Sequence, residues 1–236
     1  MKNIKIAIMQ PYFFPSLSYF KLINSVDNFI FLDDVSFIKK GWINRNKILM
    51  NGDSLFINVK CNSLSQNRKI NEIHILNSDR DRLKILQSLT HAYKKAPYFN
   101  DIFPILEAAI CFDSNLLSEY SSNTILQTLD YLGIKKNIGY SSKNFSDSEH
   151  LKGQSRIIEI CKKLDSKIYI NAEGGKNLYS KEVFENEKLN LKFLKSDFPI
   201  YNQFDNKFTP MLSIIDTLMF QNKDKVRGFL DEYSLN

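Results

Sequence analysis

Residues 4–34 read IKIAIMQPYFFPSLSYFKLINSVDNFIFLDD, and this stretch predicts a strand, a short helix and a second strand. The segments Ile4–Met9 and Phe29–Leu32 are apolar enough to be buried strands. The pattern from Tyr19 to Val26 predicts a helix of about two turns between them. A strand, a helix and a second strand make a βαβ unit, so the chain opens as an α/β protein.

Polar side chains follow both of these strands. Gln10 comes directly after the first strand, and the pair Asp33-Asp34 follows the second. The carboxyl ends of neighbouring parallel strands meet at one edge of a sheet, and open α/β proteins bind their ligands at that edge. We therefore expect the functional site at this end of the molecule.

The rest of the chain alternates strands and helices without an internal repeat. Asn51-Gly52 is a strong hairpin signal between two predicted strands. We predict one α/β domain over residues 1–236, with a mixed sheet, a βαβ start, an N-terminal β-hairpin and a central helical section. The polar loop at 141–153 is both the candidate boundary for a subdivision and a candidate active-site lid. The further predicted strands are Ile43–Met50, Leu55–Lys60, Ile70–Leu76, Asn137–Tyr140, Lys167–Asn171 and Leu189–Phe193, and the further predicted helices are Asp79–Lys95, Phe99–Cys111, Leu116–Leu132, Gln154–Leu164, Ser180–Asn186, Met211–Gln221 and a C-terminal helix.

The composition is that of an ordinary globular protein, with 43% hydrophobic and 25% charged residues, which argues against a disordered chain. The formal net charge is +6, but the basic residues are scattered in pairs such as Lys39-Lys40 and Lys135-Lys136. Because no arginine-rich stripe or nucleic-acid-binding signature is present, we do not expect a nucleic-acid partner. An alternative interpretation is that some of these lysines attract a phosphate-bearing small substrate.

Several classes of protein and cofactor are not indicated. No apolar run approaches the roughly 20 residues of a spanning helix, and Met1–Lys5 leads into a strand rather than a signal sequence, so we expect a cytoplasmic protein without a membrane span. The three cysteines and three histidines have no metal-ligand spacing, and we predict no metal site. No cofactor fingerprint is visible either.

Three titratable side chains are candidates for catalysis. Asp33 and Asp34 could bind a divalent cation, act as acid and base, or bind a ribose. Adjacent residues on a strand point to opposite faces, so the two act together only if the strand has already ended; the alternative role is a turn or a helix cap. His91 lies on a predicted helix and is the default general base near neutral pH, although a lone histidine on such a helix is more often a surface or core residue.

The stretch from Lys40 to Lys47 is a candidate ligand platform. If it is a strand, alternation puts Trp42, Asn44 and Asn46 on one face and Ile43, Arg45 and Lys47 on the other. An aromatic ring beside two amides suits a sugar or a base. The alternative is an edge strand with a polar outer face.

Two later stretches carry weaker signals. Gly174-Gly175 follows a predicted strand and suits a backbone anion nest, but it lacks the spacing of a P-loop or a dinucleotide fingerprint. In residues 199–216, around a loop marked by Pro210, polar residues are interleaved with apolar neighbours. Two of the polar residues, Ser213 and Asp216, share a face if they lie in a helix. Ser213 could instead begin a helix cap. The four polar residues of this stretch are Tyr201, Gln203, Ser213 and Asp216.

The sequence resembles the WbqC-like protein family in three stretches that occur in the family's order. These are IAIMQPYFFPSLSYFKLINSVDNFIFLDDVSFIKKGWINRN (6–46), YINAEGGKNLYSKEVF (169–184) and PIYNQFDNKFTPMLSIIDTLMF (199–220), and together they span nearly the whole chain. One departure is Ser18, where many relatives have glycine, which weakens any claim that the backbone approaches a ligand there. Members are typically encoded among bacterial surface-polysaccharide (O-antigen) genes.

The resemblance implies work on sugar or sugar-nucleotide intermediates. We expect a transferase that forms an amide by acyl or aminoacyl transfer to the amino group of a nucleotide-linked amino sugar. Its donor would be a thioester, a carrier-protein thioester or an aminoacyl-tRNA. In this interpretation His91, Asp33 or Asp34 is the base, and Gln10 and Asn44 are amide donors. Lys40 and Arg45 would contact phosphates, and Trp42 would stack on the ligand.

Two other hypotheses remain open. One is a non-catalytic binding or assembly protein of the polysaccharide pathway, which predicts a pocket without titratable groups of shifted pKa. The other is a nucleotidyltransferase-like enzyme, because the order strand, proline-bearing loop, helix and strand loosely resembles that class. Residues 16–19 read Ser-Leu-Ser-Tyr, so the histidines that stabilise the transferred phosphoryl group in that class are absent.

Overall fold

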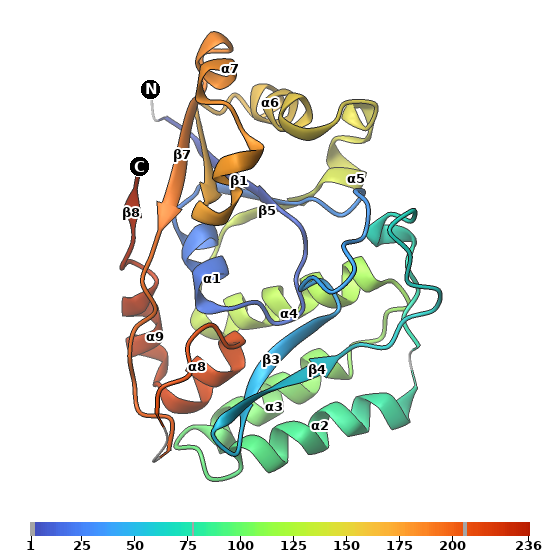
Figure 1. Cartoon of the computed structure of the whole chain (residues 1–236), viewed down its shortest axis with the longest axis vertical. Helices are drawn as coiled ribbons and strands as arrows, with labels where there is room; N and C mark the ends of the chain where they lie inside the picture. Colours follow the sequence, from blue (N-terminus) through green and yellow to red (C-terminus); the bar gives the residue numbers. More distant parts are fainter. Residues whose placement is uncertain (1–2, 77, 205–206) are drawn as a thin grey trace.

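A computed structural model of the chain describes residues 3–76, 78–204 and 207–236. A six-stranded sheet with the order β5-β2-β1-β6-β7-β8 forms its centre (Figure 1). Neighbouring strands are parallel except at one edge, where β8 pairs antiparallel with β7. The strands are β1 (Lys5–Met9), β2 (Asn28–Phe31), β5 (Asn137–Tyr140), β6 (Ile168–Ala172), β7 (Asn190–Lys195) and β8 (Ser234–Leu235).

The strand order reverses between β1 and β6. From β1 the chain builds outward through β2 to β5, and it then returns to place β6 on the other side of β1. In doubly wound proteins the loops that leave two such strands diverge, and the ligand binds between them. The sequence predicts a ligand site at the carboxyl edge of the sheet. Within that edge, this topology favours the carboxyl ends of β1 and β6 as the place where a ligand binds.

Side chains of the strands pack alternately into two apolar cores, one on each face of the sheet. Ala7 and Phe29 belong to the larger core, whereas Ile6, Ile8 and Tyr169 belong to the smaller one. The larger core includes residues of α1 (Leu17–Asn24), α4 (Leu117–Leu132), α8 (Ile214–Phe220) and α9 (Lys223–Phe229), and the smaller core includes residues of α6 (Gly153–Lys163) and α7 (Lys181–Asn186).

The predicted hairpin is present as a separate two-stranded sheet. β3 (Arg45–Met50) pairs with β4 (Asp53–Asn58) around Asn51-Gly52, whose φ angles of 52° and 86° are those of a tight hairpin turn. α2 (Asp79–Tyr93) and α3 (Phe99–Ile110) lie with the hairpin in the lower half of Figure 1, away from the sheet. The α/β class, the βαβ start, the hairpin and the central helical section are therefore confirmed.

Two predictions of local structure are wrong. Residues 70–76 are not a strand: η1 (Ile70–Glu72) is a 3-10 turn, in which the Glu72 carboxylate accepts a hydrogen bond from the Lys69 N–H and the Lys69 carbonyl accepts one from the Glu72 N–H. The predicted loop after β5 contains two short helical turns, α5 (Ser141–Asn144) and η2 (Ser146–Ser148).

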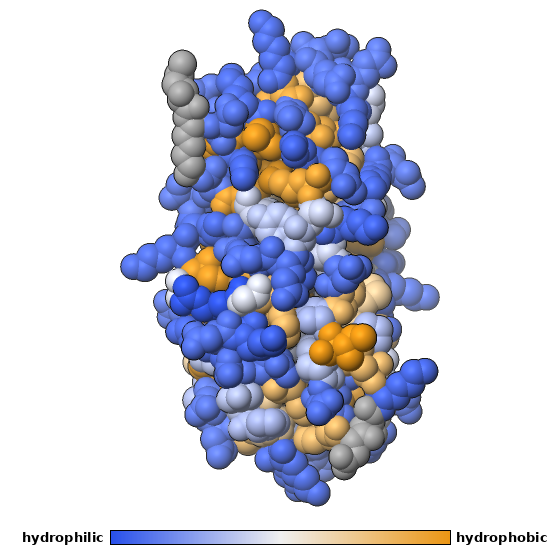
Figure 2. Space-filling model, turned by 90° about the vertical axis from the view of Figure 1, so that its left-hand side faces the viewer, coloured by the Kyte–Doolittle hydropathy of each residue, from blue (hydrophilic) through white to orange (hydrophobic). Residues whose placement is uncertain are grey.

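The edge of the molecule that carries β7, β8 and α9 is largely hydrophilic, with separate apolar patches (Figure 2). The edge strand β8 is only two residues long, and a short edge strand limits pairing with another chain. None of the helices in the described ranges is long and apolar enough to cross a membrane.

Candidate functional site

The carboxyl edge of the sheet collects polar residues from four neighbouring strands. Gln10 follows β1, Asp33 and Asp34 follow β2, and Ser141 and Ser142 follow β5. On the other side of β1, β6 leads directly into the 3-10 helix η3 (Glu173–Leu178). The edge predicted from the first fifty residues is therefore where polar groups gather.

Asp33 and Asp34 lie beyond the end of β2, so their side chains are not forced onto opposite faces. Both are buried, with 2% and 5% of their surface exposed, and both contact the Ser141 hydroxyl. Asp33 also accepts hydrogen bonds from the Ser142 N–H at 3.0 Å and from the Ser142 hydroxyl at 2.6 Å. Asp33 thus caps the first turn of α5, and the two carboxylates join the end of β2 to the end of β5.

A buried arginine completes this group. The Arg156 Nη2 on α6 donates to Asp34 Oδ2 at 2.6 Å, and both side chains are at most 5% exposed. Burial alone would raise the pKa of Asp34, but the hydrogen bonds from Arg156 and Ser141 and the positive charge of Arg156 together lower it. Asp34 is therefore a carboxylate held ionised by its partner, which makes it a weak base.

The loop after β1 is clamped by three other elements. Phe14 has a φ of 39°, an uncommon conformation for a residue with a side chain. Its N–H donates to Thr124 Oγ1 of α4 at 2.9 Å, and its carbonyl accepts from Asn46 Nδ2 of β3 and from Ser213 Oγ at 2.8 Å each. Asn46 also donates to the Phe13 carbonyl at 3.1 Å. Asn46 and Ser213 are therefore buried residues that hold this loop in place.

The predicted platform is arranged differently from the prediction. β3 begins only at Arg45, and Lys40 has a φ of 61°, so strand alternation does not extend back to Trp42. Trp42 stacks on Phe56 of β4 at 6.3 Å between ring centroids, and Phe56 also contacts the cations of Arg45, at 4.4 Å, and Lys47, at 5.3 Å. Trp42 therefore shares a surface with Arg45 and Lys47, not with Asn44 and Asn46.

Asn44 is a second buried amide with a local role. Its Nδ2 donates to the Val59 carbonyl at 3.1 Å, and its own carbonyl accepts from the Val59 N–H at 2.7 Å. The side chain is thus used to join the segment before β3 to the segment after β4.

The structure brings Tyr201, Gln203 and Asp216 together inside the protein. Asp216 Oδ2 accepts from Tyr201 Oη at 2.8 Å and from Gln203 Nε2 at 2.6 Å, and Oδ1 accepts from Tyr93 Oη of α2 at 3.0 Å. Asp216 is fully buried, and burial raises its pKa despite these hydrogen bonds. Ser213 is not part of this group: it is the N-cap of α8, as the capping alternative predicts.

The other predicted site residues lie apart from the two carboxylates. His91 is exposed on α2, which packs against α3 and the hairpin rather than against the sheet. Gly174 and Gly175 lie in η3 at the carboxyl end of β6, and neither has the positive φ that an alternating nest requires. A Cβ on Gly175 would lie 2.9 Å from Asn171 Nδ2, so this glycine permits a close approach of the Asn171 side chain.

Sequence reasoning missed Ser141, Ser142 and Arg156. The two serines directly follow a predicted strand, so the rule that selects Asp33 and Asp34 could also have found them. Arg156 lies among apolar residues of an amphipathic helix, and nothing in the local pattern indicates that it pairs with a residue 122 positions away.

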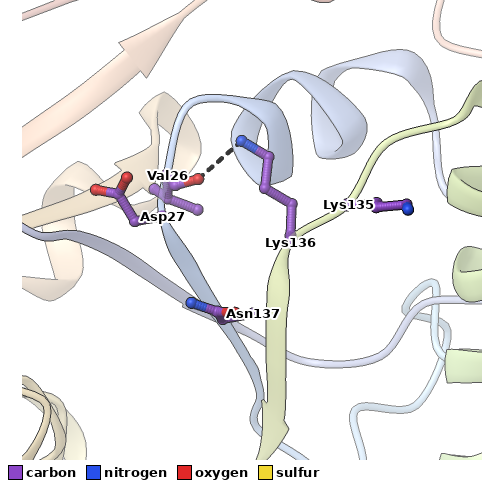
Figure 3. Close-up of a pocket in the computed structure, with 5 residues that line it drawn as sticks. All are labelled: Val26, Asp27, Lys135, Lys136 and Asn137. Carbon is purple, nitrogen blue, oxygen red and sulfur yellow. Dashed lines mark hydrogen bonds between the residues drawn. The ribbon is translucent and has the colours of Figure 1, made fainter.

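One cavity lies at the amino ends of the strands, and another lies beyond the carboxyl end of β6. One of about 280 Å³ is lined by Val26, Asp27, Lys135, Lys136 and Asn137 at the amino ends of β2 and β5, away from the carboxylates (Figure 3). There, Lys136 Nζ donates to the Val26 carbonyl at 2.9 Å. Another, of about 550 Å³, lies beside the first turn of α6 and residues 177–180 that follow β6. In the described part of the chain, no group of three or more His, Cys, Asp or Glu side chains could bind a metal ion.

Comparison with known proteins identifies the family. The chain matches the WbqC-like protein family over residues 10–228, and it therefore belongs to this family. It is 26% identical over 218 residues to the uncharacterized protein Rv1507c of Mycobacterium tuberculosis (strain ATCC 25618 / H37Rv), an alignment that covers 91% of this chain and 92% of that protein. No solved structure matches the chain.

Proposed function

We propose that this protein is a transferase of bacterial surface-polysaccharide biosynthesis that acts in the cytoplasm. Its acceptor is a nucleotide-linked amino sugar bound at the carboxyl edge of the sheet, and it transfers an acyl or aminoacyl group to the sugar amine. The observation that carries this proposal is the reversal of strand order between β1 and β6, at an edge that also holds Gln10 and the Asp33–Asp34 group.

The reaction in this proposal is an acyl transfer that forms an amide. The amine nitrogen attacks the carbonyl carbon of a thioester or an ester donor, the C–N bond forms, and the C–S or C–O bond breaks. The nitrogen loses one proton, and the leaving thiolate or alkoxide takes up one proton. A base near the amine and hydrogen-bond donors for the developing oxyanion are the groups that such a reaction needs.

Asp33 is the carboxylate that we assign to the base. Asp34 is paired with Arg156, which favours its ionised form and weakens it as a proton acceptor. Asp33 is bonded through Oδ2 to the hydroxyl of Ser142, and that serine is half-buried. In the proposed arrangement the amine proton passes to Ser142 Oγ while the hydroxyl proton passes to Asp33. The side-chain amide of Gln10 donates to the oxyanion.

The experiment is a product assay by mass spectrometry with UDP- and dTDP-linked amino sugars and a panel of acyl-CoA, acyl-carrier-protein and aminoacyl-tRNA donors. We expect an amide product from at least one pair, and none from the analogous sugar that carries a hydroxyl in place of the amine. Asp33→Asn should reduce turnover at least about a hundredfold, the lower end of what positioned acid–base groups contribute. Asp224→Asn, which changes an exposed carboxylate on α9, serves as the matched control.

One observation favours a non-catalytic binding role in the same pathway. Asp33, Asp34 and Asp216 are all buried and all hydrogen-bonded within the protein, as structural carboxylates are. That role predicts ligand binding without product for every donor, and wild-type binding by a folded Asp33→Asn variant.

A further inference from the structure

The loop after β1 is poorly suited to bind phosphate. In nucleotide-binding proteins with a doubly wound sheet, glycine-rich backbone N–H groups in this loop hold the phosphates. Residues 10–18 of this chain contain no glycine, and Pro11 and Pro15 have no N–H. The N–H groups of Phe13 and Phe14 are already bonded, to the Trp42 carbonyl and to Thr124 Oγ1. Pro11, Phe13, Phe14 and Pro15 therefore offer no free N–H group to the phosphates of a ligand, which favours side-chain cations as the groups that bind them.

The segment that leads into the β3–β4 hairpin is positively charged and contains no acidic residue that would neutralise it. Between Asp34 and Asp53 the chain contains four basic residues and no acidic residue. Two of them, Arg45 and Lys47, lie beside the same aromatic ring, Phe56. A diphosphate carries negative charge and would be repelled by the Asp33–Asp34 pair, so these cations are the more favourable neighbours.

Arg45 and Lys47 retain free donors for a ligand. Arg45 Nε donates to the Gly41 carbonyl at 3.1 Å and Nη2 to the Lys40 carbonyl, which fixes the guanidinium plane. Within the described ranges, Nη1 of Arg45 and Nζ of Lys47 make no hydrogen bond or ion pair. A pre-oriented guanidinium loses little rotamer freedom when it binds a phosphate in a bidentate manner.

This surface is next to the loop after β1. The Phe13 N–H donates to the Trp42 carbonyl at 3.0 Å, and Trp42 stacks on Phe56. The Lys47 carbonyl accepts from the Ser213 N–H at 2.8 Å, and Ser213 bonds to Phe14. The backbone segment that carries this surface therefore lies directly against the loop after β1.

We propose that the ligand's diphosphate binds to the outer face of the hairpin, on Arg45 and Lys47 beside Phe56 and Trp42. The loop after β1 then contacts the uncharged sugar through Gln10 and the half-buried Tyr12. This inference rests on the proposed function, because it divides the same ligand between two subsites. It adds Lys47 and Phe56 to the ligand site. Asn44 and Asn46 have structural roles instead, because their amides hold the ends of the hairpin and the loop after β1 in place.

The test is a calorimetric titration of the full chain with inorganic pyrophosphate and with UDP, at low and at physiological salt. We expect both probes to bind, more weakly at high salt, and Arg45→Gln/Lys47→Gln to weaken both at least about tenfold. The matched control is Lys223→Gln/Lys225→Gln on α9, which removes the same charge from two lysines that also lie over aromatic rings, Tyr131 and Phe229. The control should bind as the wild type does.

Three outcomes would overturn the subsite: no binding of either probe by the folded wild type, equal loss in the control pair, or unchanged affinity in the hairpin pair. Should the double variant fail to fold, Lys47→Glu alone tests the same face without touching the two Arg45 hydrogen bonds. Failure of the proposed function has a different signature. Pyrophosphate would then bind through Arg45 and Lys47, but no amide product would form with any amino sugar and donor.

Discussion

Asp34 and Asp216 are two buried carboxylates whose surroundings shift their pKa values in opposite directions. Asp34 faces the Arg156 guanidinium, whereas Asp216 faces only neutral donors, namely two tyrosine hydroxyls and one amide. Both lose hydration on burial, but only Asp34 gains a positive partner that outweighs this loss. The partner's charge, rather than burial, therefore decides which carboxylate stays ionised.

Removing the partner of Asp34 should be strongly destabilising. Arg156→Ala leaves a buried, unpaired carboxylate, a change that typically costs about 3–5 kcal/mol. We expect a loss of this size in urea unfolding at pH 7, and a double variant, Asp34→Ala/Arg156→Ala, that is more stable than the sum of the single changes predicts. A loss below 1 kcal/mol for Arg156→Ala would show that the pair is not formed in solution.

The two carboxylates should also give opposite pH dependences. The pKa of Asp34 is lowered on folding, so its contribution is present above the unfolded value of about 3.8 and is lost as the pH falls through the folded pKa. The pKa of Asp216 is raised, so stability falls as the pH rises from about 3.8 through its folded pKa. Unfolding free energies measured from pH 3 to 7 should rise more steeply with pH in Asp216→Asn than in the wild type; an unchanged slope would contradict the shift.

At neutral pH, Asp216→Asn should nevertheless destabilise the protein. Its amide group would face donors from Tyr93, Tyr201 and Gln203, and one or more of them would lose its acceptor. An unsatisfied buried donor costs about 1–3 kcal/mol. Tyr201→Phe, which removes one donor and leaves the carboxylate, should cost less in the same urea titration. If Asp216→Asn were the milder change, the carboxylate would not be the centre of this group.

At the scale of elements, the loop after β1 depends on the hairpin. Asn46 donates to two successive carbonyls, of Phe13 and Phe14, which keeps Phe14 in its uncommon conformation. Such conformations persist where the surroundings over-determine them, and they cluster at functional sites. The first loop and the hairpin are therefore one structural unit, although more than thirty residues separate Phe13 from Asn46 along the chain.

Asn46→Asp tests this dependence because it keeps the size of the side chain and removes its donors. The carboxylate would face two carbonyl oxygens, and we expect a loss of about 1–3 kcal/mol in the free energy of unfolding. Asn58→Asp, on the exposed side of β4, is the control and should change stability by less than about 0.5 kcal/mol. Equal effects of the two changes would mean that Asn46 does not hold the loop.

Sequence patterns predict these elements unequally well. The strand pattern of residues 4–9, the Asn51-Gly52 turn and the helix predicted at Leu116–Leu132 are local signals, and the structure confirms each of them. The strand predicted at 70–76 failed, because the hydrogen bond from the Lys69 N–H to Glu72 and the pairing with the loop after β2 outweigh the apolar pattern. The face shared by Trp42, Arg45 and Lys47 was missed, because alternation was applied to a segment that begins as turns.

At the scale of the whole molecule, the sheet brings together residues that the sequence keeps far apart. The carboxyl edge could be predicted, because Gln10, Asp33 and Asp34 follow apolar strands directly. The position of β6 beside β1, and with it the reversal of strand order, depends on long-range pairing that no local pattern encodes. The Asp34–Arg156 pair has the same origin, since it requires α6 to pack in the smaller core against the face of the sheet that carries Ile30.

The most direct test is hydrogen–deuterium exchange by mass spectrometry, with and without UDP- and dTDP-linked amino sugars. The account predicts that at least one of them slows exchange in peptides covering residues 10–16 and 33–47, while peptides at the amino edge around residues 135–137 are unchanged. Slowed exchange confined to that amino edge, or no change with any of these sugars, would contradict a ligand site at the carboxyl end of β1.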